Sequence, residues 1–202
     1  VIRDRKTRRS AGAGFGIQTS AVNAGCYSTP RNAESEEYNG TSWTEGNNLN
    51  TARSSMRGSG TATAGLTGGG YDGSPAGETE EYDGTSWTAI SDLNVAAAGR
   101  SAAGAAYTAV IAFGGYTPGS DPSSLPTGQT GSTELWNGST WTEVNDLNSA
   151  RYSSGASGTS TNAIMATGST SSPGNYVTNV ETWNGTSWTE TTDVNTARFR
   201  LG

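Results

Sequence analysis

The sequence predicts an all-β protein folded as a β-propeller, and three observations lead to this prediction. An eight-residue motif, EYDGTSWT at 81–88, recurs with few changes at 37–44, 135–142 and 182–189. The tryptophan of the motif returns about every 45 to 55 residues, the length of a four-stranded propeller blade. The chain also has 29 glycines beside six tryptophans and eight tyrosines, and such regularly spaced aromatic residues argue against a disordered chain.

The second copy of the motif shows the four strands that one blade requires. Residues 52–61 and 62–71 are predicted as the first and second strands, and the second runs into a glycine cluster. Residues 78–84 and 85–94 are predicted as the third and fourth strands. Small residues fill the predicted first strands of all copies, and this composition suits inner strands that lie close to a crowded axis.

The third and fourth strands are joined by Asn-Gly or Asp-Gly in every copy. These dipeptides are strong hairpin signals, because a type I′ turn needs positive φ at both central residues. The motif is therefore interpreted as a β-hairpin with one aromatic residue on each side of its turn. We expect both aromatic residues to pack in the core between blades, and the residues after the turn are Trp43, Trp87, Trp141 and Trp188.

The repeat divides most of the chain into four blades. Residues 1–6 match no repeat position, and residues 196–202 restart a first strand. The predicted blades cover residues 7–50, 51–94, 95–148 and 149–195.

A Gly-Gly pair after an apolar second strand, as in GGGY at 68–71 and FGGY at 113–116, resembles the kelch repeat when an aromatic residue and a tryptophan follow. The resemblance covers roughly residues 7–195, and the wording YDGTSWT…LNTAR is similar to kelch-type repeats of phage and bacterial surface proteins. It implies a kelch-like propeller on a virion or a cell surface. Kelch propellers usually close with more than four blades, so we expect part of a larger ring, with a small four-bladed ring as the alternative.

Composition excludes several classes of function. The net charge of −6 and a pI near 4.6 argue against a nucleic-acid partner. No apolar run reaches the length that a membrane-spanning helix needs, so no membrane insertion is expected. The chain has no histidine and a single cysteine, Cys26, which removes the commonest general base and an ordinary zinc site. We therefore expect no enzyme activity, no cofactor and no metal.

A glutamate stands two positions before each third-strand aromatic residue, and an arginine stands near the start of most first strands. The glutamates are Glu36, Glu80, Glu134 and Glu181, and the arginines are Arg9, Arg53, Arg151 and Arg198. In the third copy Ala98 takes the arginine's position, and Arg100 follows two residues later. The carboxylates could form a ring that binds a cation or acts as acid and base, or each could pair with an arginine to tie blades together. Because a feature found once per blade usually belongs to the scaffold, we favour the pair.

The loops between second and third strands differ among the copies, whereas the Asn-Gly hairpin keeps its length. The third copy has the longest loop, at 117–131, and the fourth is extended at 170–179. Variable loops on a rigid scaffold commonly carry recognition, although neutral insertion on a tolerant surface also explains them. The candidate ligand-binding residues are Tyr116, Asp121, Leu125, Gln129, Asn175 and Tyr176.

Two classes of function follow from these observations. The first is a non-catalytic recognition module, an adhesin-type propeller on a virion or an extracellular surface, whose variable loops bind a protein or carbohydrate ligand. The second is a structural decoration or assembly element, whose partner is another copy of the chain or a neighbouring chain in a homo-oligomer or a virion. The restarted strand at 196–202 motivates the second class, because an exposed strand can add to a sheet edge. An enzyme with a carboxylate site is a third hypothesis, but no asymmetric pair of acids supports it.

Overall fold

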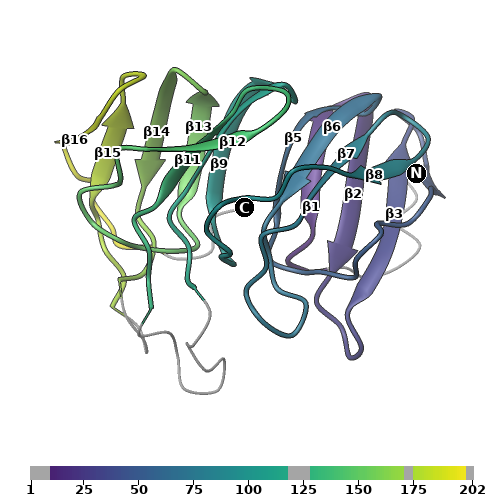
Figure 1. Ribbon diagram of the computed structural model, residues 1–202, viewed down its shortest axis with the longest axis horizontal. Helices are drawn as coiled ribbons and strands as arrows, with labels where there is room; N and C mark the ends of the chain where they lie inside the picture. The colour runs from purple at the N-terminus through teal and green to yellow at the C-terminus, as the bar shows by residue number, and fades with distance from the viewer. Residues whose placement is uncertain (1–9, 118–127, 171–174, 199–202) are drawn as a thin grey trace.

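The structure, a computed structural model, describes residues 10–117, 128–170 and 175–198. These residues form four antiparallel sheets of four strands each, with no helix among them, and each sheet uses four consecutive strands (Figure 1). We number these sheets as blades 1 to 4. In blades 1 and 2 the strands are β1 (Ala13–Ile17), β2 (Ser20–Cys26), β3 (Asn32–Tyr38), β4 (Trp43–Glu45), β5 (Arg57–Thr61), β6 (Ala64–Gly68), β7 (Thr79–Tyr82) and β8 (Trp87–Ala89). In blades 3 and 4 they are β9 (Ser101–Ala106), β10 (Ala109–Phe113), β11 (Thr133–Trp136), β12 (Trp141–Val144), β13 (Gly155–Thr159), β14 (Asn162–Ala166), β15 (Val180–Trp183) and β16 (Trp188–Thr191).

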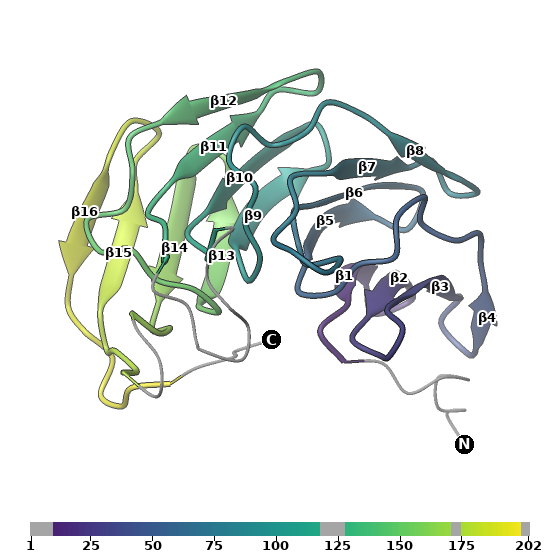
Figure 2. The ribbon, with the colours of Figure 1, turned by 60° about the horizontal axis from the view of Figure 1, so that its bottom comes forward.

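The four sheets are four blades of a β-propeller, as the sequence predicts. Their first strands lie side by side in the order β1, β5, β9 and β13, which makes them the inner strands. Figure 2 shows the blades as an arc that is open between blade 1 and blade 4. The described residues therefore do not close into a four-bladed ring.

The inner strands are built from small residues because neighbouring strands pack closely against each other. A Cβ atom at Gly58 of β5 would lie 3.4 Å from both the Ala13 side chain and the Gly14 carbonyl oxygen of β1. Side-chain hydroxyl groups also form hydrogen bonds between blades. The Ser59 hydroxyl of blade 2 donates to the backbone carbonyl of Gly104 in blade 3 at 3.1 Å. The small residues thus allow backbones to approach and supply polar links between blades, which confirms the expectation for the first strands.

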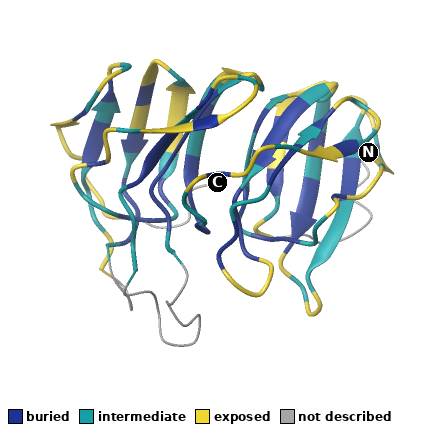
Figure 3. Ribbon diagram, in the orientation of Figure 1, coloured by how far each residue is buried: buried dark blue, intermediate teal, exposed yellow. Residues whose placement is uncertain are grey.

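The core lies between the blades rather than within them. Each blade has a leading face, toward the preceding blade, and a trailing face, toward the following one. The second-strand apolar residue of the trailing face packs against the aromatic pair of the next leading face, and Figure 3 shows the resulting buried bands along the strands. The packing sets are Val22 with Tyr82 and Trp87, Leu66 with Trp136 and Trp141, and Ile111 with Trp183 and Trp188.

The hairpin turns differ from the predicted type I′ geometry. In blade 2 the turn holds four residues, 83–86, and only Gly84 among them has positive φ, at 93°. The side chain of Asp83 accepts hydrogen bonds from the backbone nitrogens of Thr85 and Ser86, at 2.8 and 2.7 Å. The prediction of a two-residue turn is wrong because the side-chain oxygen holds a longer loop closed. The turns of blades 1, 3 and 4 repeat this arrangement with Asn39, Asn137 and Asn184.

Candidate ligand-binding face

Two kinds of connection lie at the same end of the arc: the loops from second to third strands, and the segments that link one blade to the next. We call this end the loop face and the opposite end, with the short Asn-Gly and Asp-Gly hairpins, the turn face. Short backbone bridges extend each second strand toward the loop face. In blade 3, Tyr116 bridges to Ala98 on one side and to Gln129 on the other. In blade 4, Ser169 bridges in the same way to Tyr152 and Tyr176.

The bridges hold the two long loops at their roots. Tyr116 exchanges two backbone hydrogen bonds of 2.9 Å with Ala98, and the backbone nitrogen of Thr117 donates to Gly128 at 2.9 Å. The predicted residues Tyr116 and Gln129 are therefore brought together at the base of the third-copy loop. Asp121 and Leu125 lie outside the described residues, so their roles stay predictions.

The fourth-copy loop is closed by Asn175. Its side-chain nitrogen donates to the Thr170 hydroxyl at 3.1 Å, while its carbonyl accepts from the backbone nitrogen of Thr170 at 3.2 Å. Asn175 is thus a loop-closing residue as well as a candidate ligand contact. The next residue, Tyr176, keeps 46% of its surface exposed, which suits a binding role.

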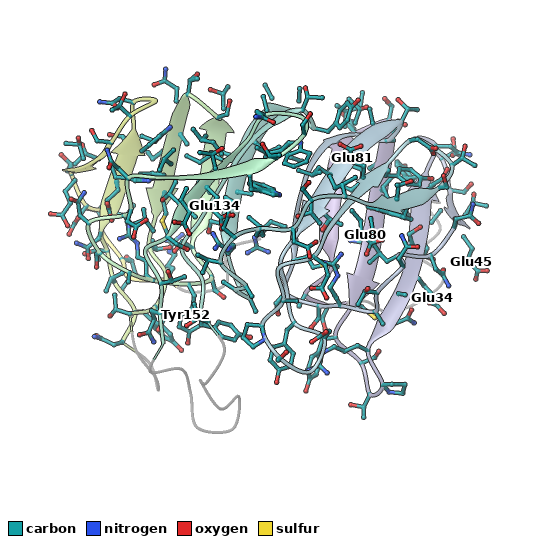
Figure 4. All side chains as sticks on the ribbon, viewed as in Figure 1. Glu34, Glu45, Glu80, Glu81, Glu134 and Tyr152 are labelled. Carbon is teal, nitrogen blue, oxygen red and sulfur yellow. The ribbon has the colours of Figure 1, made fainter. Side chains whose placement is uncertain are left out.

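Tyr152 connects the two candidate regions, and sequence reasoning missed it. Its ring meets the Tyr116 ring edge-on, with centroids 5.6 Å apart, and its backbone pairs with Ser169, which also bridges to Tyr176. Figure 4 labels Tyr152 near the loop face, below the strands. The described bases of the loops of blades 3 and 4 therefore lie side by side at the contact between Tyr116 and Tyr152.

The loop face continues over blades 1 and 2 with aromatic residues that the sequence analysis did not select. Tyr27 is 62% exposed, and the guanidinium of Arg31 lies over the ring of Tyr71 at 4.3 Å. Tyr27, Tyr71 and Tyr116 all occupy the end of a second strand. That position was the signal available in the sequence, because a tyrosine follows the glycine cluster in three of the four copies.

In blades 2, 3 and 4 the repeated glutamate is buried in a clamp with an arginine and an asparagine. One carboxylate oxygen of Glu80 accepts from the Arg53 guanidinium at 2.8 Å, and the other accepts from the backbone and side-chain nitrogens of Asn50 at 2.7 and 2.8 Å. Both charged side chains are almost fully buried. Asn50 lies in the connection from blade 1 to blade 2, so the clamp ties this connection to the third strand of blade 2, on which Figure 4 labels Glu80.

Blades 3 and 4 contain the same clamp, which supports the structural interpretation of the Glu–Arg pair. Arg151 meets Glu181 at 2.5 Å, and Arg100 meets Glu134 at 3.0 Å. Burial lowers the pKa of Arg100, and the Glu134 carboxylate opposes this shift. The bridge from Ala98 to Tyr116 matches the bridge from Ser54 to Tyr71, so Ala97, not Ala98, is the equivalent of Arg53. Arg100 reaches the same glutamate from three residues farther along the chain.

Comparisons with protein families and with curated proteins found no match to this chain. The kelch resemblance is therefore carried by the repeat residues alone. In the described ranges, no helix is long and apolar enough to cross a membrane. No group of three or more metal-binding side chains gathers among these residues either.

Proposed function

We propose that the chain is a non-catalytic recognition module, a kelch-like propeller segment that binds a glycan through its loop face on a phage virion or a bacterial cell surface. The observation that carries the proposal is the contrast between the two ends of the arc. The turn face repeats one four-residue hairpin, whereas the loops of the loop face differ in sequence from blade to blade and are longer in the third and fourth copies. A rigid scaffold with one variable end is the usual arrangement of a recognition protein.

The chemistry of the loop face favours a glycan over a protein. Tyrosine rings offer apolar faces for sugar C–H groups, and their hydroxyl groups can bind sugar hydroxyls. Gln129 pairs with Tyr116 through its backbone and Asn175 precedes Tyr176, so amide groups, which both donate and accept hydrogen bonds, belong to the same two loop bases as these tyrosines. The bases of both loops are fixed by backbone hydrogen bonds, so little conformational freedom is lost there on binding.

The proposal is tested by binding to an array of bacterial surface polysaccharides and to whole bacterial cells. We expect Tyr27→Ala and Tyr176→Ala to weaken binding about tenfold or more, because both side chains are exposed anchors. The control is Ile17→Ala, since Ile17 is 67% exposed on the turn face. Equal loss in the control, or full binding by both tyrosine variants, contradicts the proposal. Binding to proteinase-treated cells distinguishes a glycan from a protein ligand.

The long third-copy loop is tested separately. Its ends are joined by the hydrogen bond from Thr117 to Gly128, so residues 118–127 can be replaced by a short Gly-Ser linker with little strain on the blade. We expect this replacement to reduce polysaccharide binding while the melting temperature stays within a few degrees. Unchanged binding would remove Asp121 and Leu125 from the site.

A further inference from the structure

Arg31 is a cation of the loop face that no carboxylate neutralises. It is half-buried and lies in the blade 1 loop that begins at the exposed Tyr27. Its guanidinium stacks on the ring of Tyr71 in blade 2, with 4.3 Å between the central carbon and the ring centroid. Among the residues that the structure describes, no carboxylate lies within ion-pair distance of Arg31. The side chain is thus held by an aromatic ring and keeps its full charge.

Other arginines show that this chain supplies a carboxylate where a guanidinium is neutralised. Arg53, Arg100 and Arg151 each form an ion pair with a repeated glutamate. Arg31 has no such partner and no equivalent in blade 2, whose loop has the same length but carries Pro75 at this position. A residue that departs from the repeat is not required by the packing that all blades share. Arg31 therefore calls for an explanation outside the scaffold.

Most of the hydrogen-bond donors of Arg31 are unused. A guanidinium carries N–H donors on each of its nitrogens. In the described part of the chain these donors meet one acceptor, the backbone carbonyl of Asp72, which lies 3.4 Å from Nη1. Nε is buried without an acceptor, whereas Nη2 has no acceptor and is open to solvent. The two terminal nitrogens can therefore take a carboxylate or a phosphate in the bidentate arrangement that a planar guanidinium favours.

We propose that Arg31 binds an acidic group of the glycan, so that the ligand of the loop face is an anionic polysaccharide with sugar carboxylates or phosphates. The inference rests on the proposed glycan binding and names the class of glycan. Stacking on Tyr71 positions the guanidinium before the ligand binds, so little side-chain freedom is lost. Tyr27, earlier in the same loop, is 62% exposed and offers its ring to an apolar sugar face.

One nearby carboxylate opposes an anionic ligand. Asp72 is exposed, and its carboxylate accepts from the backbone nitrogen of Ser74 at 3.0 Å and from the Ser74 hydroxyl at 3.4 Å, but forms no ion pair with Arg31. The net charge of −6 opposes an anion at longer range as well. The attraction must therefore come from direct contact with Arg31. Removing the charge of Arg31 should weaken binding, and removing the charge of Asp72 should strengthen it.

The test compares an acidic polysaccharide with its own neutral form. The probe is a bacterial polysaccharide of hexuronic acid and neutral sugars, and reduction of its carboxylates to primary alcohols gives the neutral form with the same linkages. The measurement is made at about 0.15 M salt, which screens the long-range repulsion. We expect Arg31→Gln to weaken binding of the acidic form about tenfold or more and to leave the neutral form unchanged. A phosphate-bearing polysaccharide, before and after removal of its phosphate, tests the other acidic group in the same way.

Three further variants make the test specific. Ile17→Glu lowers the net charge by one, as Arg31→Gln does, but at a position that is 67% exposed on the turn face, and it should not change binding. Arg31→Lys keeps the charge and loses the planar pair of donors, so binding of the acidic form should fall, though less than in Arg31→Gln. Asp72→Asn should strengthen binding of the acidic form about twofold. Melting temperatures close to that of the unmodified chain show that the variants are folded.

The outcomes separate this inference from the proposed function. Loss of binding in Tyr27→Ala but not in Arg31→Gln would keep the glycan site and overturn the acidic subsite. An equal loss for the acidic and neutral forms in Arg31→Gln would also overturn it, because the arginine would then act on the shape of the loop. If the unmodified chain binds none of the polysaccharides, both proposals are wrong. Dependence on Arg31 for one acidic group alone supports the subsite and identifies that group.

Discussion

At the scale of single residues, the three described glutamate clamps place ionised side chains in the interior of the protein. Each carboxylate is buried and is neutralised by one guanidinium, and its remaining lone pairs are filled by an asparagine and the backbone of the connection. Burying charges costs several kcal/mol per ion, roughly, unless all their polar groups are satisfied. The clamp therefore contributes less to net stability than its short distances suggest, but removing one member leaves a buried charge alone.

Glu80→Gln should destabilise the protein by about 3 to 5 kcal/mol, because Arg53 would be left buried with no counter-charge. The matched control is Glu81→Gln on the opposite face of the same strand, for which we expect a change of about 0.5 kcal/mol or less. Urea unfolding followed by tryptophan fluorescence measures both. The double variant Arg53→Met with Glu80→Leu should recover part of the loss. If Glu80→Gln lowers the free energy of unfolding no more than Glu81→Gln does, the ion pair between Glu80 and Arg53 does not contribute as expected.

Tyr82 should make the stability fall at high pH. Burial and the hydrogen bond that its hydroxyl donates to Glu37 raise its pKa well above the ordinary value. In the unfolded chain the same group ionises near pH 10, roughly, so its contribution is complete below that pH and is lost as the pH rises above it. We expect a loss of about 1 kcal/mol between pH 10 and 11 from this group, with a slope that approaches about 1.4 kcal/mol per pH unit above pH 11. Urea midpoints measured at pH 9 and pH 11 should therefore decrease less for Tyr82→Phe than for the unmodified protein. An equal decrease in both proteins would refute the assignment to Tyr82.

At the scale of the elements, the hairpin turn depends on a side-chain oxygen. Asn184 accepts from the backbone nitrogens of Thr186 and Ser187, both at 2.9 Å. Asn184→Ala should cost about 1 to 2 kcal/mol, because two hydrogen bonds are lost. Asn184→Asp should be nearly neutral, since Asp83 performs the same role in blade 2. Thermal unfolding distinguishes the two substitutions, and an equal loss for both would contradict the role of the oxygen.

The strands were predictable from sequence to a greater degree than the surface that the loops form. The repeated motif located the third and fourth strands of each blade, because pairing of Tyr82 with Trp87 recurs wherever the aromatic pair recurs. The turn type was missed because the dipeptide Asn-Gly occurs in both two-residue and four-residue turns. Only the strand register, in which Tyr82 pairs with Trp87, distinguishes the two turn lengths. Tyr152 was missed because its contact with Tyr116 joins two blades, and no local pattern reports a contact across that distance.

At the scale of the whole molecule, the arc is a row of blades in which each contacts only its neighbours. Its stability is then a sum of blade and junction terms, and a change at one junction should act locally. The middle blades are covered on both faces, whereas the inner strand of blade 4 is largely exposed (Figure 3). Opening of blade 4 alone should therefore require less free energy than opening of blade 2 or blade 3.

Phe113→Ala tests this local behaviour. Phe113 is fully buried at the junction of blades 3 and 4, and its ring lies 4.6 Å from that of Trp188. Its removal should weaken the junction by about 3 to 5 kcal/mol. Amide hydrogen exchange in β14 and β15 should accelerate, while exchange in β2 and β6 stays unchanged, because those strands share no contact with the altered junction. Ile17→Ala, at an exposed position of β1, should leave exchange in both regions nearly unaltered. A uniform acceleration through all four blades would instead mean that the arc unfolds as one cooperative unit, and the nearest-neighbour description would then be wrong.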